Sequence, residues 1–201
     1  MRIAVLASGR GSNFQSLIDA SERGELPNAN LVLLVVNKKN AKAIERAEKH
    51  GIDWIFIDHR GKDRVVFDKE MIDKLTEYKV EGIILAGFMR ILSTDFVIQY
   101  KNRILNIHPS LLPLFPGAHA HRDALDANVA KSGCTVHFVD GGVDTGPIIL
   151  QKEVIINPDD TEETLSNRIL IQEHIAFPEA LHLFSSNRLK VINNKVEILS
   201  P

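Results

Sequence analysis

Residues 3–13 read IAVLASGRGSN, and this short stretch decides the fold class. Residues 3–7 form an unbroken apolar run, which is typical of a strand buried on both faces of a parallel sheet. Glycines then interrupt the run, and a helical pattern starts at Ser12 and stops at Gly24. A buried strand that turns through glycines into a helix predicts the first β–α unit of an open α/β sheet.

The same alternation continues through the first half of the chain. Further strands are expected at residues 31–36, 52–57, 82–86 and 103–107, and further helices at residues 41–50, 62–78 and 94–100. Because buried apolar strands alternate with helices, this pattern predicts a mostly parallel, twisted sheet with helices on both faces and right-handed crossovers.

The second half of the sequence changes character. Residues 108–122 are rich in proline and are expected to form a loop. Residues 134–139 alternate as a strand does, with Cys134 on the apolar face, and another strand is expected at 147–156. A long helix follows at 161–184, with acidic residues crowding its first turn. Residues 191–196 predict a hairpin, so the carboxyl-terminal portion is expected to be antiparallel.

Charge and composition narrow the function classes. The chain has 201 residues, with 24 Lys and Arg against 26 Asp and Glu and a formal net charge of -2. No segment is strongly basic, so a nucleic acid is not an expected partner. The longest apolar stretch, residues 31–36, is far below membrane-spanning length, so no membrane partner is expected either. We therefore expect small-molecule substrates and a cytoplasmic protein.

Cysteine and histidine usage adds two further expectations. Cys134 is the sole cysteine, so no internal disulfide forms, and this favours a reducing compartment. The thiol is expected to lie in the core rather than act as a nucleophile. His119 and His121 have H-x-H spacing, but no Cys or acid cluster completes a ligand set, so no metal is expected. His137 is interpreted as a hydrogen-bonded strand histidine beside the site.

The first candidate site is the glycine-rich turn at residues 8–13. Glycines permit a tight turn, and the helix start supplies unpaired N–H groups and a partial positive charge. Ser12 or Asn13 would either cap the helix or donate to a phosphate oxygen. Neither dinucleotide fingerprint is matched, and Asn37 stands where a ribose-binding acid would follow the second strand. The turn favours a phosphate monoester, with an ordinary strand–helix turn as the alternative.

Two further candidates carry polar side chains at strand ends. Asn106 and His108 are two residues apart, so they share a face at the carboxyl edge of the predicted sheet. A carboxamide can donate to an oxyanion, and an imidazole can shuttle protons at neutral pH. Asp144, in the glycine-rich loop 140–147, would orient an imidazole placed beside it. Alone, each motif also fits an ordinary turn.

Together these segments resemble the glycinamide ribonucleotide formyltransferase family. The resemblance covers essentially the whole chain, in order and at similar spacing, and rests on residues 8–15, 86–92, 106–113, 133–140 and 143–148. It implies a formyltransferase-type, Rossmann-like fold in a single domain, residues 1–201. Residues 1–107 would form the nucleotide-binding half and residues 108–201 the folate-binding half.

The resemblance also implies an activity and a set of roles. The enzyme would move the formyl group of 10-formyltetrahydrofolate to the amine of 5-phosphoribosylglycinamide, without a metal, and a homodimer is compatible with the sequence. Asn106, His108 and Asp144 match the catalytic residues. The nucleotide substrate's phosphate and ribose would be bound by Gly11, Ser12, Asn13 and Glu173. The folate would be bound by Arg64, Met89, Arg90, Ile91, Leu92, Asn106, Asp140, Gly141, Gly142, Val143 and Asp144.

Three alternatives share parts of this pattern. A methionyl-tRNA formyltransferase would need a further carboxyl-terminal domain and more positive charge. A formyltetrahydrofolate deformylase-like hydrolase would carry an extra amino-terminal domain, whereas the first strand begins near Arg2 here. A non-catalytic folate- or nucleotide-binding module would bind ligands without formyl transfer. Gly141, where an acid is expected in relatives, and Leu170, where a polar residue is expected, depart from the family pattern.

Overall fold

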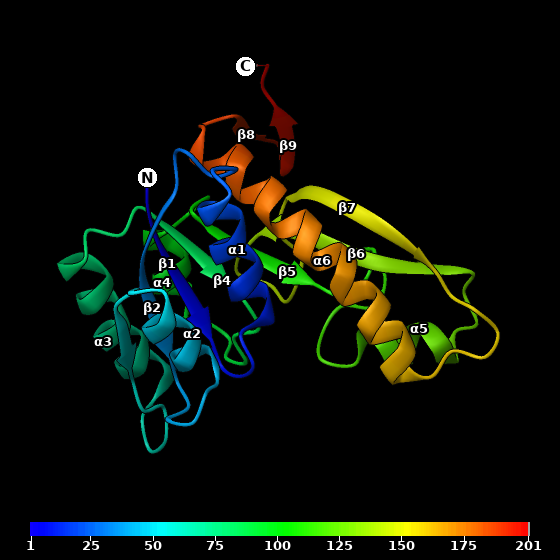
Figure 1. The fold of residues 1–201 in the computed structure, drawn as a ribbon, viewed down its shortest axis with the longest axis horizontal. Coiled ribbons are helices and arrows are strands. Elements are labelled where there is room, and N and C mark those ends of the chain that lie inside the picture. The colour runs from blue at the N-terminus through cyan, green and yellow to red at the C-terminus, as the bar shows by residue number, and fades with distance from the viewer. Residues whose placement is uncertain (201) are drawn as a thin grey trace.

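The computed structural model describes residues 1–200, and a seven-stranded sheet runs through it with helices on both faces (Figure 1). The sheet contains β1 (Arg2–Ala7), β2 (Asn30–Val36), β3 (Trp54–Phe56), β4 (Gly82–Leu85), β5 (Ile104–His108), β6 (Lys131–Phe138) and β7 (Ile148–Ile155), and a separate hairpin pairs β8 (Leu189–Ile192) with β9 (Lys195–Ile198). The helices are α1 (Ser12–Glu22), α2 (Ala43–Lys49), α3 (Arg64–Glu77), α4 (Thr94–Gln99), α5 (Ala120–Asp126) and α6 (Glu162–Ser185).

The strand order is β3-β2-β1-β4-β5-β6-β7. Strands β1 to β5 are mutually parallel, whereas β6 pairs antiparallel with β5 and β7 antiparallel with β6. The predicted fold class is therefore confirmed, including its antiparallel carboxyl-terminal portion. The sheet continues across residue 107, so both halves of the chain share it.

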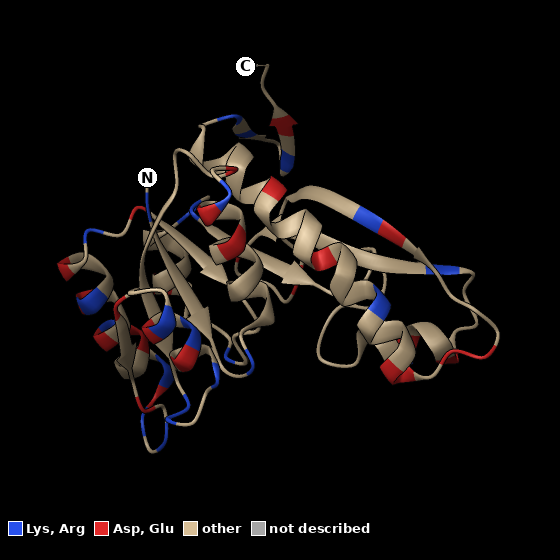
Figure 2. Ribbon diagram, in the orientation of Figure 1, with Lys and Arg blue, Asp and Glu red and all other residues tan. Residues whose placement is uncertain are grey.

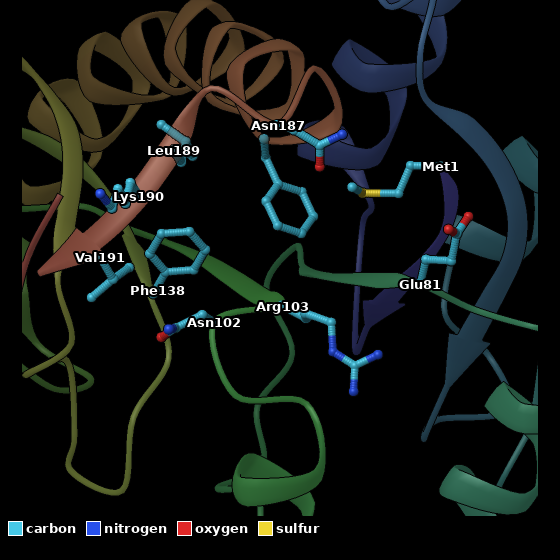
Figure 3. Close-up of a pocket in the computed structure, with 10 residues that line it drawn as sticks. Met1, Glu81, Asn102, Arg103, Phe138, Asn187, Leu189, Lys190 and Val191 are labelled. Atoms are coloured by element: carbon cyan, nitrogen blue, oxygen red, sulfur yellow. The ribbon is translucent and has the colours of Figure 1, made fainter. Parts of the chain in front are cut away.

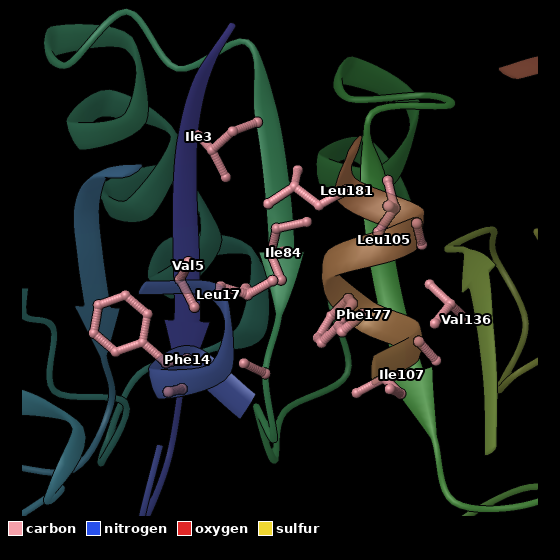
Figure 4. Close-up of a cluster of buried hydrophobic side chains, with 14 of the residues drawn as sticks. Ile3, Val5, Phe14, Leu17, Ile84, Leu105, Ile107, Val136, Phe177 and Leu181 are labelled. Carbon is pink, nitrogen blue, oxygen red and sulfur yellow. The ribbon is translucent and has the colours of Figure 1, made fainter. Parts of the chain in front are cut away.

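A hydrophobic core lies on each face of the sheet, and this explains why β1 is apolar at every position from Ile3 to Ala7. Val5 of β1 packs in a core with α1 and α6, while its neighbour Leu6 packs in the core on the other face with α3 and α4. Figure 4 shows the first of these cores, where Phe14 of α1 and Phe177 of α6 lie against the sheet. Because successive side chains of a strand point to opposite faces, a strand covered on both sides needs apolar residues throughout.

The second half differs from the sequence-based expectation in two places. The loop expected at 108–122 ends earlier, because α5 begins at Ala120. This helix is short and buries only Ala120 and Ala124, so it has no apolar stripe that a sequence pattern would reveal. Strand β6 also begins at Lys131, before the expected residue 134.

Helix α6 crosses the sheet and begins with a reciprocal cap. The Thr161 side chain accepts from the Thr164 backbone N–H at 3.2 Å, and the Thr164 side chain accepts from the Thr161 N–H at 2.9 Å. The sequence had indicated only the acidic residues of the first turn, Glu162 and Glu163. Such a capping box satisfies N–H groups that have no partner within the helix. No helix within residues 1–200 combines the length and the apolar character needed to span a bilayer.

The order in which successive strands are added to the sheet reverses direction at β1, and this point marks where a ligand site is expected. The chain leaves β1 toward β2 on one side, and β4 pairs with β1 on the other. In open α/β sheets ligands bind at the carboxyl ends of the strands, where the order reverses in this way. Ser8 joins the two strand ends, since its N–H donates to the Gly87 carbonyl at 3.1 Å and its hydroxyl accepts from the Met89 N–H at 2.8 Å.

Candidate active site

The glycine-rich turn after β1 leaves the start of α1 without a side-chain cap. Gly11 is the N-cap residue, with φ of +69°, and neither Ser12 nor Asn13 caps the helix. A Cβ atom on Gly11 would lie 2.7 Å from the Ala43 Cβ and 2.9 Å from its Cα, so only glycine fits. The first turn contains no acidic residue. The free N–H groups and the helix dipole make this turn suited to an anion.

A buried hydrogen bond joins the glycine-rich turn to α6. Asn13 Nδ2 donates to Glu173 Oε2 at 2.7 Å, and Glu173 is only 7% exposed. Burial raises the pKa of the Glu173 carboxyl, and the hydrogen bond from Asn13 opposes that rise. The carboxamide oxygen of Asn13 is buried and has no partner within residues 1–200. Asn13 belongs to segment 1–107 and Glu173 to segment 108–201, so both segments contribute residues to the predicted nucleotide site.

Three side chains predicted to act together do meet at the carboxyl end of β5. Asn106 and His108 project from the same face of that strand, and the loop between β6 and β7 brings in Asp144. His108 Nδ1 lies 3.3 Å from Asp144 Oδ2, and Asn106 Nδ2 donates to Asp144 Oδ1 at 3.4 Å. Asp144 has φ of +54°, which lies in the left-handed region of backbone conformation.

Both ring nitrogens of His108 face hydrogen-bond acceptors. Nδ1 faces the Asp144 carboxylate, and Nε2 lies 2.8 Å from the carbonyl oxygen of Phe115. A doubly protonated ring would donate to both acceptors, whereas a neutral ring satisfies only one. The Phe115 contact is formed by the proline-rich segment 108–122, which covers the imidazole, and His108 is only 5% exposed.

Asp144 is held in its ionised form. Burial acts to raise its pKa, but the neighbouring His137 and His108 imidazoles and the hydrogen bond from the Gly117 N–H together lower the pKa below its ordinary value. The Gly117 N–H donates to Asp144 Oδ2 at 2.8 Å. The carboxylate therefore presents negative charge to His108 throughout the neutral pH range.

His137 is a hydrogen-bonded strand histidine beside the site, as predicted, but its contact with Asn106 was not predicted. This side chain was expected to lie beside the site, and the structure places its Nε2 3.1 Å from Asn106 Nδ2 and 3.6 Å from Asp144 Oδ1. The signal that would have found it is the pairing of β6 with β5, which sets His137 directly opposite Asn106. That antiparallel register depends on tertiary structure and cannot be read from the alternation within β6 alone.

The residues predicted to bind folate follow β4 and border the same edge. Met89 and Ile91 are 71% and 59% exposed, which leaves apolar surface uncovered beside the site. Arg90 lies over the Phe67 ring, with its guanidinium carbon 5.6 Å from the ring centre. The Leu92 side chain is 8% exposed and packs in the core with residues of α3 and α4, so only its backbone is free to contact a ligand.

The loop after β6 supplies the remaining predicted folate residues. Asp140 Oδ1 accepts from the Gly142 N–H at 3.0 Å and from the Thr145 hydroxyl at 2.7 Å, which shapes the loop. Gly141, Gly142 and Val143 are exposed. A cavity of about 210 Å³ borders this loop, and Asp144 lines it. The other lining residues are Leu112, Pro113, Pro116, Val143, Thr145, Gly146 and Ile148.

Positive charge gathers on the loops that follow β1, β2 and β3. Figure 2 shows Lys and Arg along this edge of the molecule, contributed by Arg10, Lys38, Lys39, Lys42, Arg60, Lys62 and Arg64. Arg64 begins α3 and is exposed. Arg60 and Lys62 are paired with Asp58 and Glu70, so the charge available to an anionic ligand at this edge comes from the other lysines and arginines.

A larger cavity of about 490 Å³ lies away from these residues (Figure 3). Its walls include Met1, Glu81 and Arg103, each of which precedes a parallel strand, so it opens at the opposite edge of the sheet. None of the three residues that meet at β5 lines it.

Two other predictions concern cysteine and metal chemistry. Cys134 is fully buried on the core face of β6, and burial raises the pKa of its thiol to about 12, so the prediction of a core cysteine is confirmed. Within residues 1–200, no group of three or more His, Cys, Asp or Glu side chains is arranged to hold a metal ion.

The chain matches known proteins over nearly its whole length. Residues 1–181 match the formyl transferase family. The phosphoribosylglycinamide formyltransferase of Escherichia coli (strain K12) is 41% identical over 195 residues, covering 96% of this chain and 92% of that protein. Glycinamide ribonucleotide transformylase 1 of Symbiobacterium toebii has a TM-score of 0.97 and 43% identity, covering 100% of this chain and 94% of the other.

Similarity extends to a longer, multifunctional protein. The trifunctional purine biosynthetic protein adenosine-3 of Drosophila pseudoobscura pseudoobscura is 50% identical over 194 residues, which cover 96% of this chain but only 14% of that protein. The fold, the site and these matches define the class: the chain belongs to the formyl transferase family. Within that family it is similar, over nearly the full length of both chains, to phosphoribosylglycinamide formyltransferases.

Proposed function

We propose that this chain transfers the formyl group of 10-formyltetrahydrofolate to the amine of 5-phosphoribosylglycinamide. The products are formylglycinamide ribonucleotide and tetrahydrofolate, and the reaction is a step of de novo purine biosynthesis. The observation that carries the proposal is the contact of His108 with Asp144 beside Asn106, at the sheet edge that also bears the uncapped Gly11 turn.

The nucleotide substrate spans the Gly11 turn and α6. Its phosphate accepts hydrogen bonds from the N–H groups that begin α1, with Ser12 and Asn13 beside it. Its ribose hydroxyls donate to Glu173, whose carboxylate oxygens only accept. This arrangement is supported by the 2.7 Å hydrogen bond between Asn13 and Glu173, which sets the two binding groups side by side.

The folate binds along the segment that follows β4. Exposed Met89 and Ile91 cover its pterin ring, with Arg90 beside them and the loop from Asp140 to Asp144 closing from the other side. Arg64 pairs with a carboxylate of the benzoylglutamate tail. Burial of exposed apolar side chains by a flat ring stabilises such a complex by roughly 25 cal/mol for each Å² removed from water.

The chemistry follows from the residues at the carboxyl end of β5. The substrate amine attacks the formyl carbon, and the new carbon–nitrogen bond leaves a tetrahedral oxyanion. Protonated His108 and the Asn106 carboxamide donate to that oxyanion. The bond from the formyl carbon to folate N10 then breaks, the amine loses a proton, and N10 gains one through His108 or a water molecule. Asp144 faces Nδ1 at 3.3 Å and keeps the imidazole oriented.

The proposal requires only small-molecule partners. One chain supplies every group named, so the chemistry is the same in a monomer and in a homodimer, with residues 1–201 acting as a single domain. None of the steps uses a metal ion. A cytoplasmic location is part of the proposal, as expected for a chain with a single cysteine and hence no internal disulfide.

Release of tetrahydrofolate, followed by absorbance, tests the proposed function. With 10-formyltetrahydrofolate present, the proposal predicts release only when 5-phosphoribosylglycinamide is added. Release at the same rate without the amine would identify a deformylase, and ligand binding without release in either case would identify a non-catalytic module.

A further inference from the structure

His137 is a buried histidine that the chemistry above does not use. It lies on β6, 2% exposed, and the antiparallel register sets it directly opposite Asn106 on β5. Cross-strand neighbours on one face of a sheet are within contact distance. The two side chains therefore share the face that carries the reacting groups.

The two partners of the His137 ring define its protonation. Nδ1 lies 2.7 Å from the carbonyl oxygen of Phe138, which only accepts, so Nδ1 carries a proton. Nε2 lies 3.1 Å from Asn106 Nδ2, which only donates, so Nε2 presents its lone pair. A neutral ring protonated at Nδ1 satisfies both contacts, and the longer separation of 3.6 Å from Asp144 Oδ1 is then no hydrogen bond.

These contacts fix the orientation of the Asn106 carboxamide. One amide N–H donates to His137 Nε2 at 3.1 Å, and the other faces Asp144 Oδ1 at 3.4 Å. A half-turn of the amide would set its oxygen against two acceptors and lose both hydrogen bonds. The nitrogen is thus held on the side of Asp144 and His108.

We propose that His137 is a positioning residue that anchors the Asn106 carboxamide so that its second N–H meets the oxyanion. The inference rests on the proposed formyl transfer. The hydrogen bond to His137 is the shorter of the two and holds the amide in place. The longer one, to Asp144, is the bond that the substrate oxygen replaces as negative charge develops. Without His137, the amide nitrogen turns fully toward the Asp144 carboxylate and its N–H is lost to the oxyanion.

A double-mutant cycle separates this role from a merely structural one. His137→Phe removes the acceptor, and we expect kcat to fall about tenfold, the effect of one hydrogen bond, with both KM values unchanged. In an Asn106→Ala background the same change should lower kcat less than twofold, since interacting residues are not additive. His137→Gln, whose side-chain oxygen can accept from Asn106, should recover part of the loss. Cys134→Ala, on the core face of the same strand, is the control and should keep kcat within twofold.

Equal losses from His137→Phe in both backgrounds, or no loss of kcat in either, would overturn the assignment. The wild-type ring offers a readout that needs neither a variant nor turnover. Nitrogen-15 NMR of the histidine rings should show His137 protonated at Nδ1 and unprotonated at Nε2 at pH 7.5. A proton on Nε2 would contradict the anchoring role of His137. The proposed formyl transfer would be unaffected by that result, because the release of tetrahydrofolate tests it separately.

Discussion

His108 Nδ1 lies 3.3 Å from Asp144 Oδ2, although one residue ends β5 and the other belongs to the loop that follows β6. The same carboxylate oxygen accepts the Gly117 N–H at 2.8 Å, so the acid is fixed before any substrate binds. The imidazole is thereby oriented by a charge that is itself held in place. Such preorganisation lets a site stabilise a transition state without rearranging.

Asp144→Asn tests the orientation of the imidazole. The amide keeps the shape of the side chain but removes the negative charge that faces the imidazole at 3.3 Å. We expect kcat to fall by about 10²- to 10⁴-fold, with a much smaller change in either KM. Steady-state kinetics measures this directly. Asp159→Asn, at an exposed position in the turn before α6, is the matched control and should behave as wild type.

Glu173→Gln should raise the thermal stability of the protein at pH 8 and weaken its binding of the nucleotide substrate. Since burial raises the pKa of Glu173 in the folded protein, the folded state binds a proton more tightly than the unfolded state does. The free energy of unfolding therefore falls as pH rises from the ordinary glutamate pKa through the raised one. The neutral amide removes this loss, so Tm at pH 8 should rise, by about 2 to 4 °C for each kcal/mol gained.

The same variant should raise the KM for the nucleotide substrate, because the amide offers one acceptor oxygen where the carboxylate offers two. Calorimetry from pH 4 to pH 9 measures the stability effect. Glu163→Gln, at an exposed position of α6, should leave the pH dependence of Tm unchanged. A Tm for Glu173→Gln that lies below wild type at pH 8 would refute the stated cause of the pKa shift.

Gly11→Ala should damage the phosphate turn in two ways. The left-handed backbone costs a residue with a Cβ about 1–2 kcal/mol, and the new methyl group would clash with Ala43. Overpacking adds about 1–3 kcal/mol, so denaturant unfolding should show a loss of several kcal/mol. The KM for the nucleotide should rise while the KM for the folate stays constant.

Gly24→Ala separates the two effects on stability. Gly24 has φ of +75°, but a Cβ there meets nothing within 4 Å. We expect only the conformational cost and no change in either KM. If both variants lose equal stability, the contact with Ala43 does not constrain the turn.

Ile91→Ser should weaken folate binding. Ile91 is 59% exposed beside the site, so its apolar surface is available to a bound ring. Losing about 1–2 kcal/mol of burial corresponds to a roughly 5- to 30-fold rise in the KM for the folate. Ile98→Ser is the control, since Ile98 is equally apolar and 66% exposed on α4, and it should leave that KM unchanged. An equal effect of the two changes would show that Ile91 does not contact the folate.

The sequence predicted the parallel core because each buried strand carries its own signal. The run from Ile3 to Ala7 is apolar at every position, and both faces of β1 are covered. Short elements without an apolar stripe gave no such signal, and α5 was missed for that reason. Element ends also shifted by a few residues, as at the start of β6.

The sequence predicted which three side chains would meet at the site, but it did not predict all of the contacts that they make. Asn106 and His108 share a strand face by spacing, the loop 140–147 offered Asp144 as a partner for an imidazole, and the resemblance to known formyltransferases joined the three. The contact of His108 with the Phe115 carbonyl and that of His137 with Asn106 depend on a loop path and a strand register. Both are tertiary features, which no local pattern records.

Transfer of a labelled formyl group is the decisive test of the proposed reaction. 10-Formyltetrahydrofolate that carries carbon-13 in its formyl group is incubated with the protein and 5-phosphoribosylglycinamide, and carbon-13 NMR follows the label. We expect the label to move to an amide carbon of the ribonucleotide in wild type, and transfer to be lost in the double variant Asn106→Ala/His108→Ala. Label recovered as free formate, or transfer by the double variant at the wild-type rate, would contradict it.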